Sequence, residues 1–171
     1  MSRWGPLSTS GRRSRGEAAP ASLKILAVED SASARKVFQT VLIRLGVPLH
    51  DVRLAADAAE AQQLFQQWQP DLVFVDVELR SSAGRPPPAP SEGGNGGKAG
   101  PIDGDGLAQW LLERDPDLRL VVVTAYDRDH PRVRALLAHG VADVIVKPVM
   151  ASQVQAILQR ISAERGGGRP K

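Results

Sequence analysis

The sequence contains no cysteine, and this absence excludes disulfide bonds and thiolate metal sites. Nothing in its composition indicates an oxidising compartment. No apolar run approaches the length of about 20 residues that a membrane-spanning helix needs. No apolar segment follows Arg12 and Arg13, as a secretory signal would require. We therefore expect a cytoplasmic protein with no membrane span and no secretory leader.

Excess positive charge is also missing from most of the chain, although the net charge is +3. Residues 1–22 hold four arginines and one glutamate, and residues 164–171 hold three cations and one glutamate, so 23–163 carries −2. We interpret 1–22 as a disordered basic tail because it lacks hydrophobic periodicity, and 164–171 as a second, glycine-rich disordered tail. The 171 residues leave room between these tails for one domain with a hydrophobic core.

Five short apolar segments alternate with five segments of helical periodicity. The predicted strands cover 23–28, 52–55, 72–77, 118–123 and 142–146, and the predicted helices cover 34–45, 58–68, 107–114, 131–139 and 152–163. Ser31 or Ser33, Asp57, Asp105 and Ser152 are the expected helix caps. Such alternation predicts an α/β fold with a doubly wound, five-stranded parallel sheet.

One connection breaks this pattern. Between Gly84 and Gly106, 13 of 23 residues are proline or glycine. Loops from a strand to a helix usually contain about 2–6 residues. The composition predicts a flexible insertion at about 81–104, in the loop after the third strand.

A carboxylate interrupts the third apolar segment. Asp76 lies within the run from Leu72 to Val77, which is typical of a strand buried on both faces. Burying a carboxylate is costly unless a cation or a hydrogen bond compensates it. Open α/β sheets bind ligands at the carboxyl ends of their strands, and we expect Asp76 to lie at such an end.

The other strands end in polar residues as well: Glu29 and Asp30, Thr124, and Lys147. Right-handed crossovers bring these ends to one edge of the sheet, together with Asp76. Neighbouring carboxylates repel unless a cation lies among them, and oxygen ligands favour Mg²⁺. A carboxylate neutralised by a metal can accept a phosphoryl group, while a lysine and a hydroxyl contact the phosphoryl oxygens. The pattern predicts a phosphoryl-transfer site.

In this order the motifs resemble the receiver domain of two-component response regulators, over residues 24–163. The matching motifs are Val28-Glu29-Asp30-Ser31 followed by Arg35, Asp76 after an apolar strand, Thr124-Ala125, Gly140 and Asp143 before the last strand, and Lys147-Pro148. The resemblance implies a receiver domain over 23–163 with a flavodoxin-like (βα)5 fold and strand order 2-1-3-4-5.

The resemblance also implies a Mg²⁺ site. Glu29 and Asp30 would hold the ion, with Asp30 the better candidate for direct ligation. The carboxylate of Asp76 and the backbone carbonyl of Glu78 would complete the protein ligands.

The same resemblance implies a signalling role rather than an enzyme. Asp76 would accept a phosphoryl group from a histidine kinase or a histidine phosphotransfer protein, Lys147 would pair with that group, and Thr124 would donate a hydrogen bond to it. That bond would move the loop after the fourth strand and alter the face of helix 4, strand 5 and helix 5. This face would contact an unknown protein target or a second copy in a dimer.

Three features depart from the family pattern. Val144 stands where the family usually has Tyr or Phe, and Tyr126 in the neighbouring loop is one substitute. The insertion displaces the usual Asp-Gly turn to Asp103-Gly104 or Asp105-Gly106. No DNA-binding or other output domain follows, so we expect a stand-alone receiver.

Several alternatives stay open. The receiver could be a final switch or a relay that passes the phosphoryl group on. A phosphorylation-independent binding module is a rival that Val144 favours. An Asp-nucleophile phosphatase ranks low, because Glu78 stands where such enzymes usually have a second aspartate. The arginines 128, 132 and 134 would form either a partner surface or a solvated helix face.

Overall fold

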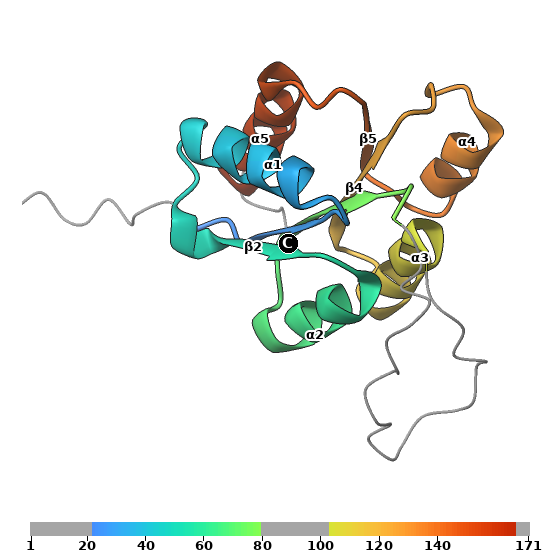
Figure 1. Cartoon of the computed structure of the whole chain (residues 1–171), viewed down its shortest axis with the longest axis horizontal. Helices are drawn as coiled ribbons and strands as arrows, with labels where there is room; N and C mark the ends of the chain where they lie inside the picture. The colour runs from blue at the N-terminus through green and yellow to red at the C-terminus, as the bar shows by residue number, and fades with distance from the viewer. Residues whose placement is uncertain (1–21, 80–102, 167–171) are drawn as a thin grey trace, which may run out of the picture.

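A five-stranded parallel sheet with strand order β2-β1-β3-β4-β5 forms the centre of the molecule (Figure 1), in a computed structural model that describes residues 22–79 and 103–166. The strands are β1 (Ile25–Val28), β2 (Val52–Ala55), β3 (Leu72–Asp76), β4 (Arg119–Thr124) and β5 (Asp143–Val146). The helices are α1 (Ala32–Arg44), the short 3₁₀ helix η1 (Leu49–Asp51), α2 (Ala58–Trp68), α3 (Gly104–Arg114), α4 (Pro131–Ala138) and α5 (Ala151–Gly166). The predicted α/β fold and strand order are confirmed.

Side chains of each strand alternate between two hydrophobic cores, because successive residues of a strand point to opposite faces. Val73 and Val75 of β3 pack with α2, α3 and α4, whereas Leu72 and Phe74 pack with α1 and α5. Figure 1 shows α1 and α5 together on one side of the sheet and α2 on the other. Burial on both faces explains why the strands read as continuous apolar runs.

Most helix ends follow the predicted signals. The side chains of Ser31 and Asp57 accept hydrogen bonds from backbone amides in the first turns of α1 and α2. Gly46 and Gly140 have φ angles of 89° and 104°, in the left-handed region that favours glycine, directly after α1 and α4. Pro131 occupies the first turn of α4, where its missing N–H costs nothing.

The predicted caps of two helices were wrong. Asp103, not Asp105, caps α3, and its Oδ1 accepts from the amide of Gly106 at 2.9 Å. Ser152 lies inside α5, which begins at Ala151, and the side chain of Gln153 accepts from the amide of Met150 at 2.9 Å. In both cases a side chain one or two residues away from the predicted one accepts from a free amide at the start of the helix.

Two boundaries of the predicted segments also shift. Helix α5 continues to Gly166, so 164–166, which the sequence assigned to the C-terminal tail, are helical. Helix α3 begins at Gly104, three residues before its predicted start. The remainder of the insertion (80–102) and of both tails (1–21 and 167–171) lies outside the described residues. Within the described part, no helix is both long and apolar enough to cross a membrane.

Candidate functional site

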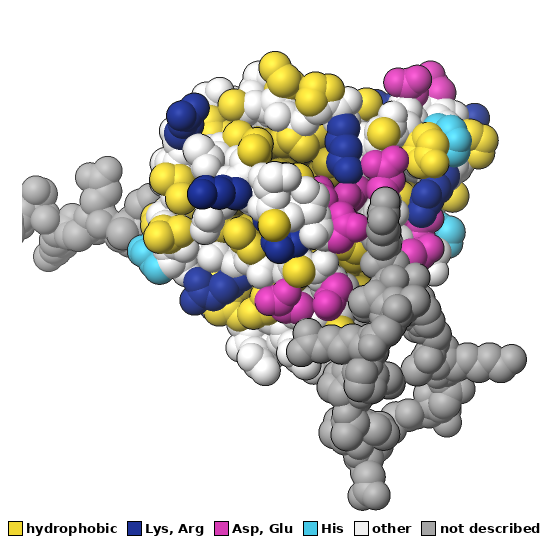
Figure 2. All heavy atoms as spheres, in the orientation of Figure 1, with side chains coloured by type: hydrophobic (Ala, Val, Ile, Leu, Met, Phe, Trp, Pro, Cys, Tyr) yellow, Lys and Arg dark blue, Asp and Glu magenta, His cyan; other side chains and the backbone are white. Residues whose placement is uncertain are grey.

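Glu29, Asp76 and Lys147 share one face at the carboxyl edge of the sheet. Each stands two residues after a strand residue that packs beneath α1 and α5, namely Ala27, Phe74 and Ile145. The alternation of strand side chains therefore sends the three polar groups in the same direction. Figure 2 shows acidic side chains gathered near the centre of this face, with basic side chains beside them.

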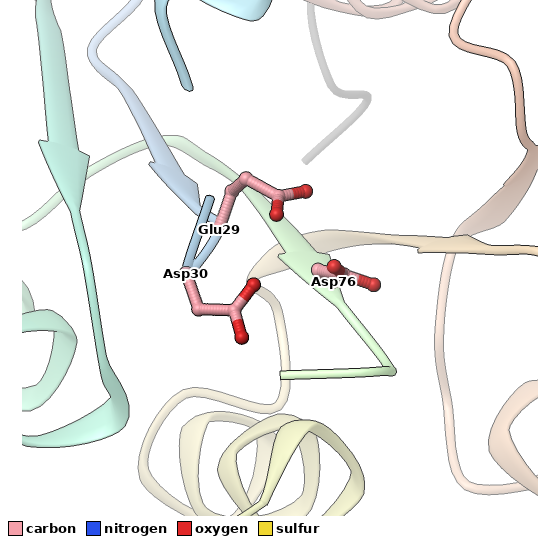
Figure 3. A group of neighbouring side chains, drawn as sticks. All are labelled: Glu29, Asp30 and Asp76. Carbon is pink, nitrogen blue, oxygen red and sulfur yellow. The ribbon is translucent and has the colours of Figure 1, made fainter. Parts of the chain in front are cut away.

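Three carboxylates converge there. Glu29 and Asp30 follow β1, and Asp76 ends the neighbouring strand β3 (Figure 3). One oxygen from each lies within 4.8 Å of the others. Asp76 is 3% exposed, whereas Asp30 is exposed to solvent. The buried group is thus held in place by the fold, and the exposed one borders the solvent side of the cluster.

Lys147 is the cation of this cluster. Its Nζ lies 2.9 Å from Asp76 Oδ2, 3.2 Å from Glu78 Oε2 and 3.9 Å from Glu29 Oε2. Burial alone would lower the pKa of Lys147, but the hydrogen bond and charge of Asp76 outweigh it and raise the pKa above its ordinary value of 10.5. Lys147 therefore stays charged beside Asp76 at any physiological pH.

Both oxygens of Asp76 accept a hydrogen bond. Oδ2 accepts from Lys147, and Oδ1 accepts from the backbone amide of Glu78 at 2.9 Å. These two bonds compensate the burial of the carboxylate and orient it toward the cluster. The side chain of Glu78 pairs with Lys147. The backbone carbonyl of Glu78 is a metal ligand only by implication of the family resemblance.

The surroundings of Glu29 favour its protonated form. Burial is the main cause that raises the pKa of Glu29, and the nearby Asp76 raises it further. The backbone amide of Ser31 and the charge of Lys147 oppose this effect, and the resulting pKa is about 7. A divalent cation among the three carboxylates would reverse this shift. Three converging carboxylate oxygens and incompletely balanced charge fit a hard ion such as Mg²⁺.

Thr124 ends β4, one residue after Val123, which is the partner of Asp76 in the sheet, and it is fully buried. Its hydroxyl oxygen accepts a hydrogen bond from the backbone amide of Tyr126 at 3.1 Å. Among the described residues no acceptor takes the hydroxyl proton, and a hydroxyl can donate one bond while it accepts others. Thr124 thus links the site to the loop between β4 and α4.

A pocket of about 940 Å³ opens over the cluster. Its polar lining includes the three carboxylates and Lys147, and its apolar lining includes Val37 of α1 and Val149 after β5. Val37 is 56% exposed, which is unusual for a valine next to a polar site. The cluster is therefore reachable from solvent through a partly apolar opening.

Two supporting residues were not assigned a role from the sequence. Arg35 of α1 donates hydrogen bonds to the backbone carbonyls of Glu29 at 2.6 Å and Asp30 at 2.9 Å, which holds the acidic loop. A Cβ at Gly104 would lie 2.2 Å from the carbonyl oxygen of Asp76, so only glycine fits there. The basic residue after the acidic pair was a usable signal, and Asp103-Gly104 was one of the two Asp-Gly turns that the sequence offered.

Two of the three arginines on or near α4 form ion pairs. Arg128 pairs with Asp143 and donates to the carbonyl of Val144, and Arg132 pairs with Asp105. The side chain of Arg134 is exposed and has no ion pair or hydrogen bond among the described residues, as expected for a solvated position.

Fold and site together define a doubly wound α/β protein with an aspartate-centred acidic cluster at the carboxyl edge of its sheet. No family model matches the sequence. The chain is 28% identical over 138 residues to the probable transcriptional regulator ycf27 of Guillardia theta, covering 81% of this chain and 44% of that protein. It is 28% identical over 152 residues to the response regulator MprA of a Mycobacterium strain, covering 86% of this chain and 56% of that protein.

A solved structure shares the fold. The CheY-like response regulator receiver domain protein of Methanospirillum hungatei superposes with a TM-score of 0.65 and 20% identity, covering 85% of this chain and 98% of that one. The chain therefore has the fold of response regulator receiver domains and is similar in sequence to response regulators over most of its length. It spans about half the length of the curated relatives it matches.

Proposed function

We propose that Asp76 accepts a phosphoryl group from a histidine kinase or a histidine phosphotransfer protein, and that the modified domain signals through protein contact or passes the group on. The observation that carries this proposal is the position of Asp76. Its carboxylate lies 2.9 Å from Lys147 Nζ and within a cluster of three carboxylates at the edge of the sheet.

The chain's own groups suit this transfer. An oxygen of Asp76 attacks the phosphorus, the bond from phosphorus to the donor nitrogen breaks, and the imidazole of the donor leaves. Lys147 lies where it can pair with the phosphoryl oxygens, and the free hydroxyl proton of Thr124 can be donated to one of them. The backbone amide of Glu78 holds Asp76 in orientation during the attack.

Glu29, Asp30 and Asp76 are the residues that would hold Mg²⁺, with the carbonyl of Glu78 as a fourth protein ligand. The ion would neutralise the charge that repels an incoming phosphoryl group. Arg35 would contribute indirectly, because it holds the backbone carbonyls of the acidic pair. The partly apolar pocket over the cluster, with the exposed Val37 on its rim, would admit the phosphodonor.

The test uses acetyl phosphate as a small phosphodonor. With Mg²⁺ present, intact-mass measurement should show one added phosphoryl group in the unaltered protein and in Asp129→Asn, an exposed control. Asp76→Asn and a sample with excess EDTA should show none. Lys147→Gln should slow the modification by about 10- to 100-fold, because it removes charge stabilisation in the transition state. Equal modification of Asp76→Asn would contradict the proposal.

A phosphorylation-independent binding module is the second candidate. Val144 favours it, because this buried aliphatic side chain replaces the aromatic residue that the family resemblance leads us to expect. Partner binding, measured with and without the modification that the mass measurement records, separates the two functions. A chain that binds its partner equally well with and without modified Asp76 would be such a module.

A further inference from the structure

Arg132 reaches the backbone directly after Asp76. From the first turn of α4, its Nη2 donates a hydrogen bond to the carbonyl oxygen of Val77 at 3.2 Å. Its Nε pairs with the carboxylate of Asp105 in the first turn of α3. One side chain therefore ties α4 to α3 and to the end of β3.

Arg132 also faces the loop that leaves Thr124. Its guanidinium lies 5.9 Å from the centre of the Tyr126 ring, which stacks on His130 with ring centres 4.2 Å apart. The amide of Tyr126 donates to the hydroxyl of Thr124 at 3.1 Å. Arg132 thus contacts the segments that follow both the acceptor aspartate and the hydroxyl beside it.

The contact between Arg132 and Asp105 leaves one acceptor unused. Asp105 Oδ1 is buried and has no hydrogen-bond partner among the described residues. A buried oxygen without a partner raises the free energy of the arrangement that contains it. An ion pair that carries such a cost is easier to release than a fully satisfied one.

On the basis of the function proposed above, we propose that Arg132 is a positioning residue that couples the phosphorylation of Asp76 to the position of α4. In the unmodified chain it holds α4 against Asp105 and Val77. When the hydroxyl of Thr124 donates to a phosphoryl oxygen, the turn from Thr124 to Tyr126 shifts and disturbs the packing around the guanidinium. Release of the Asp105 contact then frees α4.

Hydrogen exchange of the α4 amides, followed by mass spectrometry on the full chain, tests the coupling. Each sample is incubated with Mg²⁺, with or without acetyl phosphate, and its intact mass is recorded in parallel. In the unaltered protein, modification should speed α4 exchange by about three- to tenfold, as expected for loss of one partly exposed ion pair. Arg134→Gln, an exposed position on the same helix, should behave identically.

Arg132→Gln should exchange fast already without acetyl phosphate, and modification should change its rate by less than about twofold. Asp105→Asn removes the other partner of the ion pair and should give the same result. It replaces Arg132→Gln as the test if that variant does not fold. A purely structural role would speed exchange equally in both states and leave their ratio unchanged, and this outcome would overturn the inference. If Asp76 is modified but α4 exchange does not change, the inference on Arg132 is wrong and the proposed function stands. If Asp76 is not modified at all, the proposed function is wrong as well.

Discussion

At the scale of single residues, Gly104 shows how tightly the site is built. A Cβ at this position would lie 2.2 Å from the carbonyl oxygen of Asp76 and 2.7 Å from the Cα of Val77. Both are backbone atoms, which cannot rotate away as a flexible side chain would. The first residue of α3 is therefore packed directly against the segment that carries the acceptor carboxylate.

Gly104→Ala should destabilise the protein by about 2–4 kcal/mol, because the end of β3 or the start of α3 must move. Gly46→Ala is a useful comparison, since its φ of 89° is unfavourable for alanine but nothing lies within 4 Å of the added Cβ. We expect it to cost only about 1 kcal/mol. Urea unfolding measures both, and equal losses would show that the close approach at Gly104 does not matter.

At the scale of elements, Asp143 joins three parts of the chain. Its carboxylate pairs with Arg128 in the loop after β4 and with Arg160 of α5, while it also accepts from the amide of Val144. Burial alone would raise the pKa of Asp143, but the bonds from Arg160, Val144 and Arg128 lower it below the ordinary value of 3.8. The bonds from Arg128 and Arg160 attach the first residue of β5 to the loop after β4 and to α5.

A lowered pKa in the folded state means that Asp143 stabilises the protein above the unfolded pKa and loses this contribution as the pH falls through the folded value. Asp143→Asn should therefore cost about 1–3 kcal/mol at pH 7, the range for hydrogen bonds to a charged group. The difference should shrink below a pH of about 3.8. Urea unfolding at several pH values measures it, and a constant difference would exclude the charge of Asp143 as its source.

At the scale of the whole molecule, the close approach of Gly104 to Val77 brings the two ends of the insertion near each other. The described chain stops at Leu79 and resumes at Asp103, so both ends of the intervening segment lie near the site. A short connection can bridge them. Folding of the domain then does not require the length of the proline- and glycine-rich insertion.

Replacing residues 80–102 by about five glycine and serine residues should preserve one cooperative unfolding transition. Stability should rise on the order of 1 kcal/mol, because closing a shorter loop costs less entropy. A glycine- and serine-rich replacement of the original length is the matched control and should leave stability nearly unchanged. Thermal or urea unfolding decides the matter, and loss of the cooperative transition in the shortened chain would refute the prediction.

The sequence alone determined the number, type and order of the strands and α-helices, because periodicity is a local property that short windows reveal. It also identified the strand ends that carry Glu29, Asp30, Asp76, Thr124 and Lys147, since parallel strands with right-handed crossovers share a carboxyl edge. It placed the start of α3 three residues late, because Asp103-Gly104 and Asp105-Gly106 carry the same local signal and only packing separates them.

Only the tertiary structure decided how those residues are connected. It placed Lys147 Nζ 2.9 Å from Asp76, 71 residues away in the chain, and Arg132 within hydrogen-bonding distance of Val77, 55 residues away. The sequence leaves Arg132 open as part of either a partner surface or a solvated face. Such contacts depend on how several elements pack against one another, and no local pattern of residues specifies that packing.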